Sequence, residues 1–214
     1  MNKKIILSSL VIIVLIVGIL FSLRPAKLVI VIDAGHGGTD PGTMSANGIY
    51  EKDINLAIAK KIAASLSKAH YKVIMVRQDD STFSLEQRYA LANNQQADLF
   101  ISVHANAIEN NADVSGMQVL YYPDTTQYNA ELAQQMLTSL LQATSASDKG
   151  AIARPDLAVL RGTTMKSLLI ETGFMTNEQE AEKLLQTTYQ QKIATAVTKA
   201  VDGYVQTKLL PIKK

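Results

Sequence analysis

The stretch from Val31 to Gly42, Val-Ile-Asp-Ala-Gly-His-Gly-Gly-Thr-Asp-Pro-Gly, constrains the fold more than any other part of the sequence. It overlaps an apolar run from Leu28 to Ile32, which is typical of a strand buried on both faces. Its second half is rich in glycine and predicts a turn. His36 therefore lies on a sharp loop just beyond a strand. Because ligands of open α/β sheets bind outside the carboxyl ends of the strands, His36 is either a site residue or an incidental polar residue of a turn.

The rest of the chain alternates between strand-like and helix-like segments. The segment from Glu51 carries an apolar residue at every fourth position, which predicts a helix with Glu51 in its first turn. Ser84 is a plausible N-cap for the next helix. The alternation predicts an α/β fold, with one domain built on a twisted, mostly parallel sheet of about six strands and helices on both faces. Further strands are expected over 72–77, 98–103, 117–122, 158–160 and 167–170, and further helices over 84–92, 128–142, 177–185 and 189–208.

Composition excludes several classes of protein. A chain of 214 residues has room for one ordinary domain. It has no cysteine, which excludes disulfides, thiolate nucleophiles and cysteine-ligated metals. Four of the 21 basic residues lie at positions 3, 4, 24 and 27, so the remainder of the chain has 17 basic and 19 acidic residues. This near-neutral balance argues against nucleic acid as a partner.

An apolar segment of nineteen residues runs from Ile5 to Leu23 and follows Met-Asn-Lys-Lys. It is long enough to cross a membrane, and it ends in Phe-Ser-Leu-Arg-Pro instead of a small-x-small cleavage site. We therefore favour an uncleaved signal anchor over residues 1–27, in preference to a cleaved secretory signal. A single globular domain is expected over residues 28–214.

Four residues with metal-binding or acid–base chemistry are expected at one edge of the sheet. His36, His104 and Glu171 each follow a predicted strand, so parallel strands would bring them together, and Glu51 can face the same edge from the start of its helix. Two histidines and one carboxylate with an open fourth position form the usual catalytic zinc site. A second carboxylate nearby can act as general base.

This set of residues predicts hydrolysis of an amide. Zinc held by neutral imidazoles and one carboxylate stays electrophilic, and it brings the pKa of a bound water toward roughly 7. Glu171 would take the proton of the water and deliver it to the leaving amine. The gaps of 15 and 53 residues between the three ligands match no short metal motif. A phosphate-binding loop is the alternative for the glycine turn, but the Gly-x-x-x-x-Gly-Lys-Ser/Thr pattern is missing.

In combination, six blocks of the chain resemble the zinc-dependent N-acetylmuramoyl-L-alanine amidases, bacterial cell-wall enzymes of the LytC and AmiC kind (amidase type 3). The resemblance spans about residues 28 to 205. The blocks are the stretch from Val31 to Gly42, Gly48 with Glu51-Lys-Asp53, Arg77 followed by Asp80, Arg88 to Asn93, Asp98-Leu-Phe-Ile-Ser-Val-His-Ala-Asn-Ala107 and Leu169-Ile-Glu-Thr-Gly-Phe-Met-Thr-Asn177.

The resemblance implies an enzyme with one Zn²⁺ per chain that cleaves the amide between the lactyl group of N-acetylmuramic acid and L-alanine in peptidoglycan. His36, Glu51 and His104 match the metal ligands of the family, and Glu171 matches its catalytic glutamate. The chain departs from the family at Lys166, where many relatives have proline before the last strand. This departure puts the start of that strand in doubt.

Three further residues are candidates for supporting roles. Asp33 could orient His36 through its other ring nitrogen, or it could cap the glycine turn. Asn106 either contacts substrate or closes its loop. Arg88, like Arg77, could bind acidic groups of the stem peptide, although an ion pair with Asp79, Asp80 or Glu86 is favoured.

The expected partners follow from this resemblance. They are peptidoglycan and, through the N-terminal segment, the cytoplasmic membrane; nucleic acid is not expected, and the chain is expected to be a monomer. It would act outside the cytoplasm, anchored in the membrane, or secreted to the cell wall if the segment is cleaved. A zinc peptidase that cuts within the stem is the alternative enzyme. An inactive wall-binding or amidase-activating module is disfavoured because all four site residues are present.

Overall fold

The computed structural model describes residues 27–109, 111–126 and 128–209, with side chains up to 207. The predicted signal anchor over residues 1–27 thus lies almost entirely outside the described residues. Among those that are described, no helix has the length and apolar character needed to cross a membrane.

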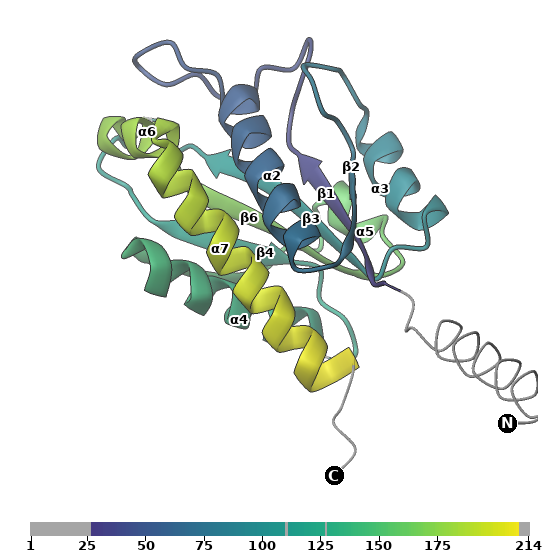
Figure 1. Cartoon of the computed structure of the whole chain (residues 1–214). Helices are drawn as coiled ribbons and strands as arrows, with labels where there is room; N and C mark the ends of the chain where they lie inside the picture. Colours follow the sequence, from purple (N-terminus) through teal and green to yellow (C-terminus); the bar gives the residue numbers. More distant parts are fainter. Residues whose placement is uncertain (1–26, 110, 127, 210–214) are drawn as a thin grey trace, which may run out of the picture.

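A single sheet of six strands forms the centre of the molecule (Figure 1). The strands lie in the order β2-β1-β3-β6-β4-β5, and every neighbouring pair is parallel except β4 and β6. The prediction of a mostly parallel α/β sheet is therefore confirmed. The strands are β1 (Val29–Ala34), β2 (Lys72–Met75), β3 (Leu99–Asn106), β4 (Met117–Tyr121), β5 (Asp148–Ala153) and β6 (Lys166–Phe174).

Helices cover both faces of the sheet, as Figure 1 shows. One face carries the larger core, to which β1 contributes Ile30 and Ile32; the other carries a smaller core, to which it contributes Val31. The larger core is closed by α2 (Glu51–Lys68), α4 (Tyr128–Thr144) and α7 (Thr187–Tyr204), which continues as a π-helical turn over Val205–Leu209. The smaller core is closed by α3 (Leu85–Asn94) and α5 (Ala158–Arg161), and α6 (Glu178–Leu185) packs beside α7 and β6.

One predicted strand is wrong and one strand was missed. Residues 158–160, expected as a strand, form the helix α5. A run of three apolar residues is too short for its periodicity to separate a helix from a strand. The missed strand is β5, which lies at the edge of the sheet and has the sequence Asp-Lys-Gly-Ala-Ile-Ala. Its polar start and its glycine carry no strand signal.

Two expectations from the sequence concern the start of α3 and the start of β6. The N-cap at Ser84 is confirmed, because its Oγ accepts from the backbone N–H of Gln87 and the Gln87 side chain accepts from the N–H of Ser84. Lys166, which replaces the proline of many relatives, starts β6 in register with Leu99. Its Nζ lies 2.6 Å from a carboxylate oxygen of Asp124. The start of this strand is therefore regular.

Candidate metal centre

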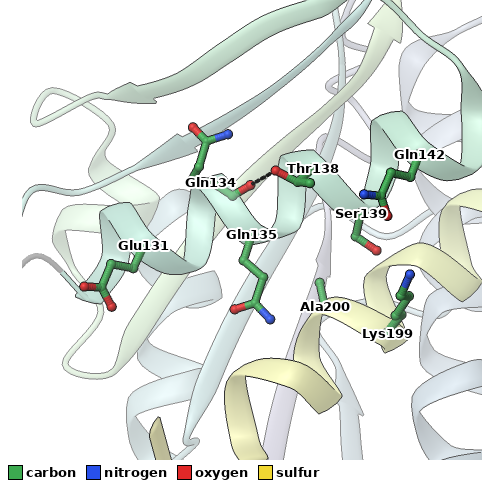
Figure 2. A pocket seen from close by; sticks show the side chains of 8 residues that line it. All are labelled: Glu131, Gln134, Gln135, Thr138, Ser139, Gln142, Lys199 and Ala200. Atoms are coloured by element: carbon green, nitrogen blue, oxygen red, sulfur yellow. Dashed lines mark hydrogen bonds between the residues drawn. The ribbon is translucent and has the colours of Figure 1, made fainter. Parts of the chain in front are cut away.

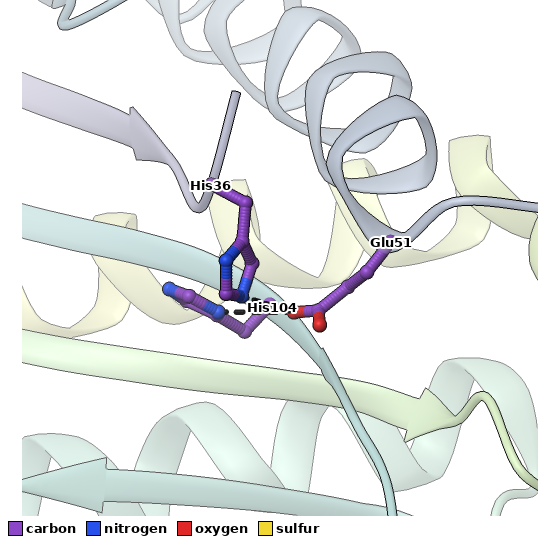
Figure 3. Close-up of side chains that lie close together, drawn as sticks. All are labelled: His36, Glu51 and His104. Atoms are coloured by element: carbon purple, nitrogen blue, oxygen red, sulfur yellow. Dashed lines mark hydrogen bonds and ion pairs between the residues drawn. The ribbon is translucent and has the colours of Figure 1, made fainter. Parts of the chain in front are cut away.

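The side chains of His36, Glu51 and His104 point toward one another at the carboxyl ends of β1 and β3 (Figure 3). Nε2 of His36 and Nδ1 of His104 each lie 3.1 Å from the same oxygen, Oε1 of Glu51. One ligand atom from each residue lies within 4.8 Å of the others. Two imidazole nitrogens and a carboxylate oxygen in this arrangement can hold a zinc ion.

Glu51 is held in place by the backbone around it. It is the first residue of α2 and is only 4% exposed. Its Oε1 accepts from the N–H of Ala105 and from Nδ2 of Asn55, and its Oε2 accepts from the N–H of Thr43. Burial raises the pKa of this carboxyl, but the hydrogen bonds and charges of the two histidines outweigh burial and lower it overall. Glu51 is therefore an ionised, oriented carboxylate.

The ring of His36 is oriented by Asp40, so the interpretation of Asp33 as the residue that orients this ring is wrong. His36 has a left-handed backbone, with φ of 60°, and its Nδ1 donates to Oδ2 of Asp40 at 2.8 Å. With Nδ1 held in this way, Nε2 faces Glu51. Burial lowers the pKa of His36, but Glu51 and Asp40 outweigh it and raise the pKa to about 9. A cation between the ligands would take the place of a proton there.

Asp33 instead forms a buried ion pair beneath the site. It is 1% exposed, its Oδ1 accepts from Nη1 of Arg88 at 2.7 Å, and its Oδ2 accepts from the hydroxyl of Ser102 at 2.8 Å. Neither sequence interpretation of Asp33 anticipated this arrangement. The alternation of side chains along β1 explains it, since Asp33 shares the face of Val31, on which α3 packs.

Two buried arginines hold the loop that carries His36. Arg88 donates from Nη2 to the carbonyl of His36 and from Nη1 to that of Ala34, both at 2.8 Å. Arg77 donates to the carbonyls of Ala34 and Gly35, both at 2.9 Å. The carboxylates of Asp79, Asp80 and Glu86, which we expected to pair with these arginines, are not their partners. Both arginines support the left-handed turn at His36.

We expect Asp33→Ala to lower the free energy of unfolding by about 3–5 kcal/mol, because Arg88 would remain as a buried charge without its partner. Urea denaturation measures this loss. Asp113→Ala is the matched control, since Asp113 is exposed, and its effect should stay within about 0.5 kcal/mol. Equal stability of the two variants would contradict the structural role of the Asp33–Arg88 pair.

Glu171 lies beside the three candidate ligands and is not part of their cluster. On β6 its neighbours in register are His104 of β3 and Gln118 of β4. Its Oε2 is buried, and within the described residues this atom has no hydrogen-bond partner. Burial raises the pKa of Glu171 to about 7; His104 opposes the rise and Glu51 adds to it. A carboxyl group that titrates near neutral pH can both accept and donate a proton.

Two glycines leave room for the candidate ligands. A β-carbon on Gly35 would overlap the ring of His104. Gly42 has a left-handed φ of 65°, and a β-carbon there would lie 2.6 Å from Oε2 of Glu51 and 2.8 Å from the His36 ring. Gly35 and Gly42 are therefore required by close packing against the site.

Comparison with known proteins identifies the family. The family model described as N-acetylmuramoyl-L-alanine amidase (Amidase_3) matches residues 30–203. The chain belongs to this family. It is 38% identical over 174 residues to the uncharacterized protein YqiI of Bacillus subtilis, and this alignment covers 81% of the chain and 82% of YqiI. It is 36% identical over 178 residues to the amidase LytC of the same organism, and this alignment covers 82% of the chain but only 35% of LytC.

Solved structures of amidases have the same fold. An N-acetylmuramoyl-L-alanine amidase from Clostridium difficile 630 superposes with a TM-score of 0.82 at 38% identity, covering 85% of this chain and 98% of that one. The CwlD amidase from Clostridioides difficile, solved in complex with the GerS lipoprotein, gives a TM-score of 0.81 at 32% identity over 85% of this chain and all of the other.

Asn106 of this amidase-family chain makes a side-chain hydrogen bond that the sequence did not reveal. Its Nδ2 donates to Oε1 of Gln118 at 3.0 Å, and its Oδ1 accepts from the N–H of Ala107. Asn106 thus closes its loop and also orients Gln118, the neighbour of Glu171. Gln118 was not predicted as a residue of the site. It is the second residue of β4, and nothing in its local sequence distinguishes it from a solvent-facing strand residue.

Two of the cavities in the described chain differ in their position relative to the four site residues. One, of about 250 Å³, opens beside His36, Asp40 and His104 and has Phe83, Leu85 and Val159 among its apolar walls. The other, of about 510 Å³, lies on the far side of the larger core between α4 and α7 (Figure 2). It contains none of the four site residues, and glutamines contribute much of its lining. The first cavity is therefore the one next to the candidate chemistry.

Proposed function

We propose that this chain is a zinc-dependent N-acetylmuramoyl-L-alanine amidase. It would hydrolyse the amide between the lactyl group of N-acetylmuramic acid and the L-alanine of the stem peptide in peptidoglycan. Family membership supports the reaction. One structural observation carries the proposal: three potential metal ligands converge next to a buried carboxyl oxygen, on Glu171, that has no hydrogen-bond partner in the described chain.

The residues present fit a zinc ion. Nε2 of His36, Nδ1 of His104 and a carboxylate oxygen of Glu51 would hold it, with Asp40 fixing the His36 ring from the other side. When bound, zinc would polarise the scissile carbonyl and make a water molecule more acidic at neutral pH. No more than three protein ligands converge among the described residues, so a fourth position would be open to water or substrate.

Glu171 would transfer a proton from the attacking water to the leaving nitrogen. As the carboxylate, it accepts a proton from the water that attacks the carbonyl carbon. As the carboxylic acid, it then donates this proton to the nitrogen of L-alanine while the C–N bond breaks. The buried position of Oε2 favours this exchange, because burial brings the pKa of Glu171 to about 7. Arg77 and Arg88 contribute by fixing the loop that presents His36.

The location of the substrate is relevant to the proposed role of the N-terminal segment as a signal or a signal anchor. Peptidoglycan lies outside the cytoplasmic membrane, so the proposed amidase would act there. The domain boundaries that we propose remain 1–27 for a signal anchor, or for a signal if the segment is cleaved, and 28–214 for the catalytic domain.

Product analysis on purified peptidoglycan tests the reaction. We expect intact stem peptides with free L-alanine amino termini, because the bond cleaved is the one that joins the stem to the lactyl group. Labelling of new amino termini followed by mass spectrometry detects them. New termini within the stem would instead indicate a peptidase, and the absence of any new termini with zinc-loaded protein would indicate a binding or activating module.

A further inference from the structure

We propose that Asn55 is a positioning residue for the metal. Its side-chain amide holds the carboxylate of Glu51 against the loop that carries His36, and it thereby sets the affinity of the site for zinc. This inference rests on the proposed function, which supplies the zinc ion. It goes beyond that function because Asn55 is not a member of the cluster of candidate ligands.

The amide of Asn55 joins two of the segments that supply candidate ligands. Asn55 is fully buried and lies one turn after Glu51 on α2, so the two side chains share a face of the helix. Its Nδ2 donates to Oε1 of Glu51 at 3.2 Å and to the carbonyl of Gly35 at 3.3 Å. Gly35 directly precedes His36. Figure 3 shows that Glu51 and His36 come from the helix and from the loop that this amide connects.

The two partners determine which way the amide faces. An ionised carboxylate and a backbone carbonyl can only accept hydrogen bonds, so Asn55 has to present its NH₂ group to both of them. The opposite orientation would place its oxygen against two other acceptors. Each N–H is then used once, one for Glu51 and one for Gly35. The amide is therefore held in a single orientation.

The stability of the fold does not account for a polar side chain at this position. Oδ1 of Asn55 is buried and has no hydrogen-bond partner within the described residues, and such an atom destabilises the folded chain. The carbonyl of Gly35 also accepts from Nη2 of Arg77. Oε1 of Glu51 also accepts from the N–H of Ala105. Neither acceptor would be left without a donor if Asn55 were apolar.

A role in holding the metal accounts for the amide. A cation requires the carboxylate oxygen of Glu51 to stay within reach of both imidazoles. The N–H of Ala105 fixes this oxygen relative to the end of β3, which carries His104. Asn55 fixes the same oxygen relative to the loop that carries His36. Hydrogen-bond partners of metal ligands typically contribute about 10–100-fold to metal affinity, because they orient the ligand before the metal binds.

Asn55→Leu tests the proposal, because leucine has nearly the shape of asparagine and no donor. Competition of the full chain with a chromophoric chelator measures the dissociation constant of zinc, which we expect to rise about 10–100-fold. The melting temperature of the metal-free variant should not fall below that of the wild-type protein, since the substitution removes the Oδ1 atom that lacks a partner. Asn55→Ala should raise the dissociation constant to the same extent, although its cavity lowers the melting temperature.

Asn129→Leu is the matched control, since Asn129 is a buried asparagine of α4 whose role is structural. Its Nδ2 donates to the carbonyl of Tyr122, and its Oδ1 accepts from the N–H of Ser167, near the start of β6. Leucine at this position removes both hydrogen bonds from buried backbone, so the melting temperature should fall. The dissociation constant of zinc should equal that of the wild-type protein. The two leucine variants are thus expected to change affinity and stability in opposite patterns.

The outcomes separate this proposal from the proposed function. If the wild-type protein and both Asn55 variants bound zinc equally tightly, the positioning role would be overturned and the zinc site would stand. Equal losses of zinc affinity in Asn55→Leu and Asn129→Leu would also overturn it, because any substitution in the core would then have the same effect. A wild-type protein that bound no zinc would overturn the zinc-dependent function, and the role of Asn55 with it.

Discussion

Glu171→Gln is expected to lower kcat by about three orders of magnitude, because glutamine can neither accept nor donate the proton. The substitution keeps the size of the side chain and removes no metal ligand. Zinc content and melting temperature should therefore match those of the wild-type protein. Hydrolysis of purified peptidoglycan, together with elemental analysis of the same samples, measures both quantities.

Glu182→Gln is the matched control for this prediction, since Glu182 is exposed on α6 and makes the same change of charge. Its activity should equal that of the wild-type protein. If Glu171→Gln lost zinc along with activity, Glu171 would be a ligand and not the proton carrier. If Glu171→Gln kept full activity, another group would have to carry the proton.

The sequence was sufficient to place the four main residues together. The segments before His36, His104 and Glu171 are largely apolar, and this pattern is typical of strands buried on both faces. Once such strands are parallel, the residues after them meet at one edge. Glu51 could be placed because the periodicity of its helix starts there, and Ile54, Ile58, Ile62 and Leu66 are indeed buried.

The hydrogen-bond and ion-pair partners near these residues could not be predicted, because they depend on the conformation of loops and on contacts between residues far apart in sequence. Asp33 and Asp40 are both near His36 in sequence, but only the turn through Gly37 and Gly38 brings Asp40 to the ring. Asp33 stays in the strand and meets Arg88, which is 55 residues away. One signal was available: a histidine that binds metal needs a second hydrogen-bond partner, and Asp40 is an acidic residue in the same glycine-rich loop.

Gln118, the neighbour of Glu171 on β4, was equally hidden from sequence. It has no distinctive neighbours in the chain, and only the antiparallel pairing of β4 with β6 brings it next to Glu171. The sequence therefore predicted the residues that we propose for the reaction, whereas the surroundings of Glu171 required the order of the strands.

Removal of metal with a chelator is expected to abolish peptidoglycan hydrolysis, and added Zn²⁺ should restore it. The chain should remain folded meanwhile. Without metal, Glu51 still accepts from the N–H groups of Thr43 and Ala105, so the buried carboxylate keeps its hydrogen bonds. Hydrolysis that persists in metal-free protein would contradict the zinc mechanism.

Thermal unfolding of the chelated protein provides a readout that does not depend on activity. Zinc at 1,000 times its dissociation constant should stabilise the folded chain by about 4 kcal/mol, because it binds the folded state. Glu51→Gln should lose this response, since a neutral amide is a poor ligand for zinc at a site built from one carboxylate and two imidazoles. Asp53→Asn, an exposed acidic residue in the same first turn of α2, should keep it. If both variants responded to zinc equally, the ion would bind elsewhere, and the convergence of His36, Glu51 and His104 would be a structural feature alone.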